Sequence, residues 1–213
     1  MLTPEEKQDK LDAHKREDKR PLNKILKQKM IDVFGEEMAN SANIHDLAFP
    51  EEILEKFYSW IKKDKNIFWF SGNPGCGKSH MACAYCNHLL DLDINFRLMP
   101  ETEFYAILRA AIQKNWEAEY EIARLCETDY FILDDVGASL NFNNWHKEQL
   151  FSFVDKRWTS QKPTFMTSNL LSAELSNTLS PRLVSRIKDS KNVYVELDWI
   201  DKRRDDKWRR NGV

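Results

Sequence analysis

Glycine is scarce in this chain, since 213 residues contain only six. Hydrophobic runs longer than a strand are also missing, which excludes a membrane-spanning helix of about 20 apolar residues. The N-terminus is rich in Lys, Glu and Asp and lacks the apolar core of a signal peptide. Together these absences predict a cytoplasmic protein that makes no contact with a membrane.

No charge of one sign dominates, because the formal net charge is −2, and this argues against a generic polyanion binder. The positive charges are nevertheless unevenly placed. Residues 7–29 carry nine Lys or Arg against four Asp or Glu, and residues 201–210 carry six against three. Each segment is a candidate contact for nucleic acid or an acidic partner; the alternative is a solvated helical arm and a soluble tail.

Cysteine is absent from the first 75 residues, which excludes a zinc module there. Cys83 and Cys86 have the spacing of half a zinc site, with His80 and His88 nearby, but no second Cys pair exists to complete it. We therefore interpret these cysteines as small, soft packing residues on a helix that lies against a sheet.

The first 64 residues have helical patterns. Thr3, Pro4 and Glu6 form the start of a charged helix that runs to about Arg20, and Pro21 ends it. Apolar residues at positions 22, 25, 26, 30, 33 and 34 then form the stripe of an amphipathic helix that needs a partner surface. Pro50 begins another helix over residues 51–63. We expect 1–64 to be a helical N-terminal extension that binds a partner.

The rest of the chain alternates between strands and helices. We expect strands over 66–71, 95–100, 129–135, 163–169 and 192–197. Between them we expect helices over 78–91, 101–127 (two helices, broken near Asn115), 144–159, 172–177 and 181–189. This alternation predicts parallel βαβ units, and hence an α/β three-layer αβα sandwich with a five-stranded parallel sheet. The domain is expected to span 65–198, followed by a basic tail over 199–213.

Three of the six glycines fall in one loop, GNPGCGKS, over residues 72–79. The loop fits the pattern G-x-x-x-x-G-K-[ST], follows a strand and opens a helix. Glycine lets backbone N–H groups converge on phosphate oxygens, and the helix directs its positive end to the same point. Lys78 would neutralise the β- and γ-phosphates, and Ser79 would offer an oxygen to Mg²⁺. We expect nucleotide contacts from Gly72, Asn73, Pro74, Gly75, Cys76, Gly77, Lys78, Ser79 and His80.

Two later strands end in polar residues at the edge of the sheet where open α/β sheets bind ligands. The stretch YFILDDVG has the form of a Walker B strand, in which Asp134 holds Mg²⁺ and Asp135 orients or deprotonates the attacking water. The stretch FMTSN places Asn169 where its amide reaches the γ-phosphate or the water. The segment SPRLVSRIKD places Arg182 and Arg186 on one helix face, which suits phosphate binding in cis or as a finger to a neighbouring subunit.

Taken together, GNPGCGKS, ILDDVG, TSN and RLVSR resemble, in order and spacing, the AAA+ ATPases of the DnaC/DnaI helicase-loader and IstB transposition-helper group over about 65–198. The resemblance implies a RecA-like P-loop NTPase fold, with ATP and Mg²⁺ as cofactors and no full C-terminal lid. It implies that Asn169 is the sensor-1 residue, that Arg186 is the box VII arginine acting in trans, and that Arg182 is a second phosphate-facing arginine. Self-association through the Arg186 face follows from the same resemblance.

The resemblance implies a helicase-loader-like ATPase of DNA replication, whose partners are a DnaB-like hexameric replicative helicase and single-stranded DNA. An IstB-like transposition helper that binds duplex DNA and a transposase is the alternative, and the motifs do not separate the two. Asn169 and the two arginines argue against a small-molecule P-loop kinase. Asp135 stands where Glu is commoner, which predicts weak ATP hydrolysis without partner or DNA and leaves open a scaffold that uses ATP only as a switch.

Overall fold

The structure is a computed structural model of the 213-residue chain. It describes residues 22–64, 66–114, 117–138 and 143–197, so the expected helix over 3–20 and the tail over 199–213 lie outside the described residues. Five strands form one sheet, all parallel, in the order β2-β3-β4-β1-β5. The strands are β1 (Ile67–Gly72), β2 (Phe96–Pro100), β3 (Tyr130–Val136), β4 (Thr164–Ser168) and β5 (Val193–Leu197).

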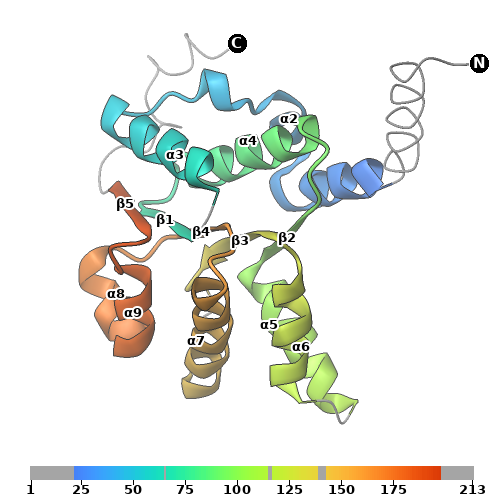
Figure 1. Cartoon of the computed structure of the whole chain (residues 1–213), viewed down its shortest axis with the longest axis vertical. Helices are drawn as coiled ribbons and strands as arrows, with labels where there is room; N and C mark the ends of the chain where they lie inside the picture. Colours follow the sequence, from blue (N-terminus) through green and yellow to red (C-terminus); the bar gives the residue numbers. More distant parts are fainter. Residues whose placement is uncertain (1–21, 65, 115–116, 139–142, 198–213) are drawn as a thin grey trace, which may run out of the picture.

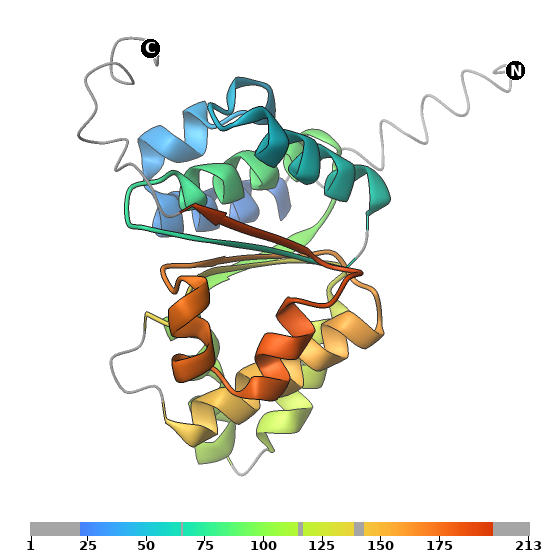
Figure 2. The same cartoon turned by 90° about the vertical axis from the view of Figure 1, so that its left-hand side faces the viewer.

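Helices cover both faces of the sheet, as Figure 1 shows from one side and Figure 2 after a quarter turn. One face carries the helix over 22–34, α2 (Glu36–Ser41), the 3₁₀ turn η1 (Ile44–Asp46), α3 (Glu51–Lys63) and α4 (Lys78–Asp91). The other carries α5 (Glu101–Gln113), α6 (Ala118–Glu127), α7 (Asn144–Thr159), α8 (Ser172–Thr178) and α9 (Pro181–Ile187). The predicted three-layer αβα sandwich is thereby confirmed.

The strands alternate between two hydrophobic cores because successive side chains point to opposite faces. In β1, Phe68 and Phe70 join the core under α3 and α4, whereas Ile67 and Trp69 join the core under α5 to α9. All six residues of β1 are buried, as expected for the inside of a parallel sheet. This interior strand, which leads into the glycine loop, is therefore held on both faces.

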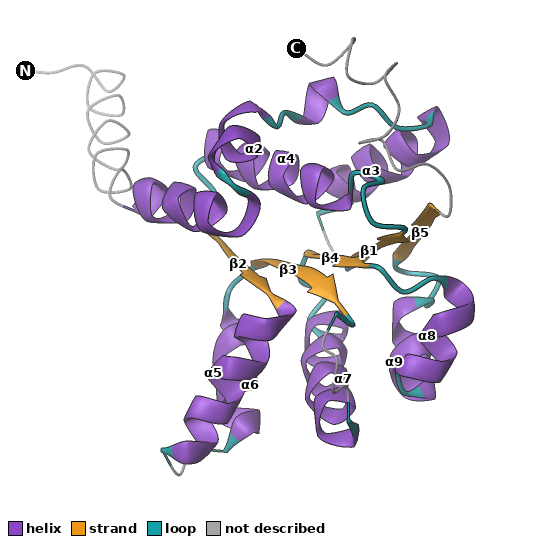
Figure 3. Ribbon diagram, turned by 180° about the vertical axis from the view of Figure 1, so that it is seen from behind, coloured by secondary structure: helices purple, strands orange, loops and turns teal. Residues whose placement is uncertain are grey.

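The apolar stripe over 22–34, which the sequence predicts to need a partner surface, is largely covered by the chain itself. Leu26 and Met30 are buried in the core that contains Phe57 and Trp60 of α3, and Val33 and Phe34 pack against it. The stripe thus finds its partner surface within the chain. Figure 3 shows from behind that the helix over 22–34 lies beside α2 and α4. Leu22 and Ile25, at the start of the helix, remain exposed, at 37% and 64%. The elements α2 and η1, which follow it, have no counterpart among the predicted elements.

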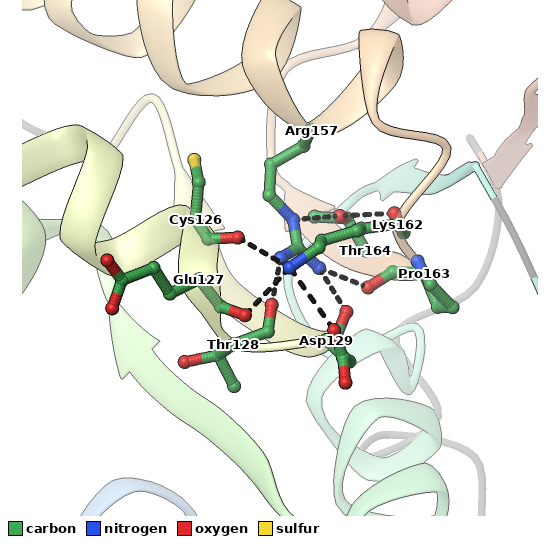
Figure 4. A network of polar contacts seen from close by, with 8 residues as sticks. All are labelled: Cys126, Glu127, Thr128, Asp129, Arg157, Lys162, Pro163 and Thr164. Atoms are coloured by element: carbon green, nitrogen blue, oxygen red, sulfur yellow. Dashed lines mark hydrogen bonds and ion pairs between the residues drawn. The ribbon is translucent and has the colours of Figure 1, made fainter.

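A buried arginine ties together the starts of β3 and β4, at the edge of the sheet opposite the glycine loop. Arg157 of α7 donates to the carbonyls of Thr128, Asp129 (2.6 Å) and Pro163 (2.7 Å), and to the Thr164 hydroxyl (2.8 Å), as drawn in Figure 4. Burial lowers the pKa of Arg157 to about 10. These carbonyls precede the two strands whose far ends carry the acidic and polar site residues.

Helices long and apolar enough to cross a bilayer are not found in the part of the chain that the structure describes.

Candidate nucleotide-binding site

The glycine loop joins β1 to α4, as the sequence predicts, and two of its glycines adopt left-handed backbone angles. Gly75 has φ 84° and Gly77 has φ 101°, a region that side-chain-bearing residues rarely occupy. Gly72 has a different requirement, because a Cβ there would lie 2.3 Å from the carbonyl oxygen of Leu197 on β5. Pro74 and Cys76 lie within the turn, and His80 lies in the first turn of α4.

Lys78 is folded back over this loop. Its Nζ donates to the carbonyl of Gly72 at 2.7 Å and to that of Asn73 at 3.0 Å, and the residue is buried. Burial lowers the pKa of Lys78, and the nearby charges, including Asp134 and Asp135, act in the opposite sense. The ammonium group therefore lies among backbone carbonyls at the mouth of the loop, where a polyphosphate offers stronger acceptors.

A β-bulge lies in the Walker B strand, at its two acids. Leu133 pairs with Met166 and Val136 pairs with Ser168, so Asp134 and Asp135 together stand opposite Thr167 alone. Asp135 adopts φ 60°, a left-handed conformation in a non-glycine residue. Bulges of this kind re-aim side chains and occur beside active sites.

Thr167 links the two acids through one hydroxyl. Its Oγ1 donates to Asp134 Oδ1 at 2.6 Å and accepts from the backbone N–H of Asp135 at 2.8 Å. The residue is buried, and it satisfies the N–H that the bulge removes from the ladder. Sequence reasoning missed Thr167; the available signal was a polar residue directly after the apolar pair Phe165 and Met166 of a buried strand.

Ser79 and Asp134 meet at the start of α4. The Ser79 hydroxyl lies 3.3 Å and 3.4 Å from the two carboxylate oxygens of Asp134. A hydroxyl beside a carboxylate is a hard oxygen donor set of the kind that Mg²⁺ prefers, with phosphate oxygens and water completing the shell. These two residues therefore fit the predicted metal site.

Burial raises the pKa of the Asp134 carboxyl, while the hydrogen bonds from Thr167 and Ser79 and the charge of Lys78 oppose the rise. A pKa above the unfolded value means that the folded chain holds this proton more tightly than the unfolded chain does. The stability contributed by this group is full below its ordinary pKa and is lost as the pH rises through the folded pKa. At neutral pH the ionised Asp134 thus costs folding free energy, which is typical of functional sites.

Asn169 contacts the second acid rather than the first. Its Nδ2 donates to Asp135 Oδ1 at 2.6 Å, so the sensor-1 candidate fixes the carboxylate of the predicted water-orienting residue. Just beyond, the buried Glu101 accepts from the N–H of Gly137 at 2.9 Å and secures the end of β3. Glu101 follows β2 directly and was not predicted as a site residue. The structure brings Lys78, Ser79, Asp134, Asp135 and Asn169 to one edge of the sheet.

The two arginines of α9 lie elsewhere, on the face that packs on α7. The Arg182 guanidinium lies 4.3 Å from the centre of the Phe151 ring, and that of Arg186 lies 4.2 Å from the centre of Trp158. The predicted shared face exists, but it is directed toward α7. Among the described residues, no hydrogen bond joins either arginine side chain to the glycine loop. Their roles stay predictions.

The sequence of the chain matches a known protein family. Residues 2–189 match the family described as IstB-like ATP binding protein. The replicative helicase loader DnaC of Escherichia coli K12 is 27% identical over 150 residues, which cover 68% of this chain and 61% of that protein. An uncharacterised protein of the same organism, YdaV, is 29% identical over 146 residues, covering 68% of this chain and 56% of that one. The chain thus spans about three fifths of the length of these relatives.

Solved structures share the fold. The crystal structure of the DnaC helicase loader superposes with a TM-score of 0.61 at 20% identity, covering 74% of this chain and 97% of that one. The crystal structure of DnaI gives a TM-score of 0.61 at 18% identity, covering 76% and 94%. The resemblance expected from the motifs is confirmed, and the family match spans most of the sequence. The chain belongs to the family of IstB-like ATP-binding proteins.

Proposed function

We propose that this chain is a helicase-loader-like AAA+ ATPase of DNA replication, which binds ATP with Mg²⁺, a hexameric replicative helicase and single-stranded DNA. The observation that carries the proposal is the meeting of Lys78, Ser79 and Asp134 at the junction of β1 and α4. The 27% identity to a replicative helicase loader over 68% of the chain supports the cellular role.

Each residue of the site has a role that follows from its contacts. Lys78 would exchange the carbonyls of Gly72 and Asn73 for phosphate oxygens, since a charged acceptor gives the stronger hydrogen bond. Ser79 and Asp134 would hold Mg²⁺, which, when bound, neutralises charge on the β- and γ-phosphates. Asp135 would orient the attacking water and accept its proton, with Asn169 fixing one of its carboxylate oxygens.

Hydrolysis by the isolated chain is expected to be slow. Asp135 is one methylene shorter than Glu, and Asn169 holds its Oδ1 at 2.6 Å, so the base reaches the water poorly until the site rearranges. The proposed trans-acting Arg186 is contributed only when copies assemble. Binding of a partner or of single-stranded DNA is therefore expected to stimulate the rate.

Deletion of the whole N-terminal region would not test helicase docking cleanly, because residues 26–44 contribute to the core. Removal of residues 2–20 spares every described residue. The double variant Leu22→Ser/Ile25→Ser changes only the exposed start of the helix over 22–34. Ile112→Ser, at an exposed position on the opposite face of the sheet, is the matched control.

The deciding experiment combines purified hexameric replicative helicase with the chain, in ATP and in ADP, and measures complex formation by size exclusion and ATPase rate with single-stranded DNA. We expect an ATP-dependent complex that Lys78→Ala abolishes, and that removal of residues 2–20 or the double variant weakens. Absence of a complex, combined with ATP-dependent binding to a transposase and duplex DNA, would contradict this proposal in favour of the IstB-like alternative. Ile112→Ser is expected to leave helicase binding unchanged.

A further inference from the structure

The side chain of Arg186 is held from two sides by α7. Its Nε donates to Asp155 Oδ1 at 2.6 Å, and its guanidinium lies 4.2 Å from the centre of the Trp158 ring. Both members of the ion pair are about one third exposed, at 34% and 35%. The group is thus fixed in direction while it stays at the surface.

The backbone of Arg186 is anchored as well. The Asn192 side chain donates to the Arg186 carbonyl at 2.6 Å, and its Oδ1 accepts from the N–H of Ile67, the first residue of β1, at 3.0 Å. The glycine loop begins at the other end of this strand, at Gly72, which is about 17 Å away at 3.3 Å per residue. Arg186 therefore lies toward the end of β1 opposite its own loop, which fits a contact with the nucleotide of a second copy.

We infer that Asp155 and Trp158 are positioning residues that aim Arg186 at the γ-phosphate bound by a neighbouring copy of the chain, an inference that rests on the proposed function. Asp155 engages Nε, the guanidinium nitrogen nearest the stem, and leaves the two terminal nitrogens as the fork that reads phosphate. The indole face restricts rotation of the guanidinium plane. Because the Arg186 side chain is ordered before the copies assemble, it loses less conformational entropy when it binds the phosphate of the neighbouring copy.

The first test compares the ATPase kinetics of three variants at Asp155 and Lys156, which are neighbours on α7. Asp155→Ala removes the acceptor and is expected to lower the stimulated kcat about tenfold while the KM for ATP is unchanged, because only the transition-state contact is misaligned. Asp155→Asn keeps an oxygen that accepts from Nε and is expected to stay within about twofold of the wild type. Lys156→Ala, which removes the neighbouring ion pair with Glu119, is the control and is expected to have no effect.

The second test separates positioning in trans from a structural role. A mixture of Asp155→Ala with Lys78→Ala contains subunits with a sound loop and subunits with a well-aimed arginine, so activity is expected to rise above that of either variant alone. Arg186→Ala combined with Asp155→Ala is expected to be no slower than Arg186→Ala alone, because the two residues act through one group. Thermal melting of each variant identifies any that fails to fold; if Asp155→Ala does, Asp155→Leu, which has a similar size but no acceptor, replaces it with the same expected loss.

Three results would overturn the inference: a higher rate in Asp155→Ala, which would mean that Asp155 restrains the arginine; wild-type kinetics in Asp155→Ala; or a mixture no more active than its parts. Failure of the proposed function is distinct. A wild-type chain that neither binds nor hydrolyses ATP refutes that proposal. If instead partner or DNA stimulates the wild-type chain and Asp155→Ala equally, only the positioning role is refuted.

Discussion

Removal of the Thr167 hydroxyl is the sharpest test of what holds the β-bulge at Asp134 and Asp135. Thr167→Val is nearly isosteric and deletes only the hydroxyl, which bonds Asp134 Oδ1 at 2.6 Å and the Asp135 N–H at 2.8 Å. The backbone N–H of Asp135 then loses its acceptor away from solvent, and the carboxylate of Asp134 loses its shortest hydrogen bond. The left-handed backbone at Asp135 then loses one of its restraints.

The expected cost is large for one oxygen atom. An unsatisfied buried N–H costs about 1–3 kcal/mol, and a hydrogen bond to a charged group contributes a similar amount. Partial relaxation brings the total to about 3 kcal/mol, which lowers Tm by roughly 6–12 °C in a domain of this size. Thr167→Ser keeps the hydroxyl and loses one methyl group, at about 1 kcal/mol.

Differential scanning fluorimetry of both variants, without nucleotide, makes the comparison. ATPase assays with partner or single-stranded DNA follow on the same samples, and we expect Thr167→Val to lose at least about tenfold in rate because both acids are displaced. If Thr167→Val melts within about 2 °C of Thr167→Ser, the hydroxyl does not hold the bulge, and the reasoning is refuted.

Three further outcomes follow from the described contacts. Arg157→Met removes the guanidinium that bonds three backbone carbonyls and the Thr164 hydroxyl, and it is expected to cost about 4 kcal/mol in urea denaturation; a change below about 1 kcal/mol would show that the guanidinium is dispensable. Asp134→Asn is expected to abolish Mg²⁺-dependent nucleotide binding and to raise Tm at pH 8. That gain should shrink as the pH falls toward 4, because Asp134 has a raised pKa and is then protonated; a pH-independent gain contradicts the assignment. Gly137→Ala places a Cβ 2.5 Å from Leu170 Cδ1 at φ 86° and is expected to cost about 2 kcal/mol by thermal melting; a neutral result argues against this close packing.

The sequence predicted those parts of the fold and site that depend on local pattern. The bounds of β1 and β3 differ from the expected ones by one residue, and the glycine loop lies between β1 and α4 as expected. These features were predictable because an apolar run or a glycine-rich loop determines the local structure of its own segment. The helix expected over 144–159 is also found, and it opens at Asn143, whose side chain accepts from the His146 N–H.

The contacts that sequence reasoning missed join residues far apart in the chain. Thr167 meets Asp135 only because β3 and β4 are neighbours with a shifted register, and Asp155 meets Arg186 only because α9 packs on α7. The stripe over 22–34 was read correctly as amphipathic, but periodicity does not tell whether the covering surface belongs to the same chain. Leu26 and Met30 show that here it does.

The central claim is that the glycine loop wraps a nucleotide's phosphates with Asp134 beside their metal. A crystal structure with Mg²⁺ and a non-hydrolysable ATP analogue tests it most directly. We predict that Lys78 Nζ leaves the Gly72 and Asn73 carbonyls for the β- and γ-phosphates, with the metal bound by Ser79 and close to Asp134. A structure in which Lys78 keeps both carbonyls while the analogue binds elsewhere would contradict the account.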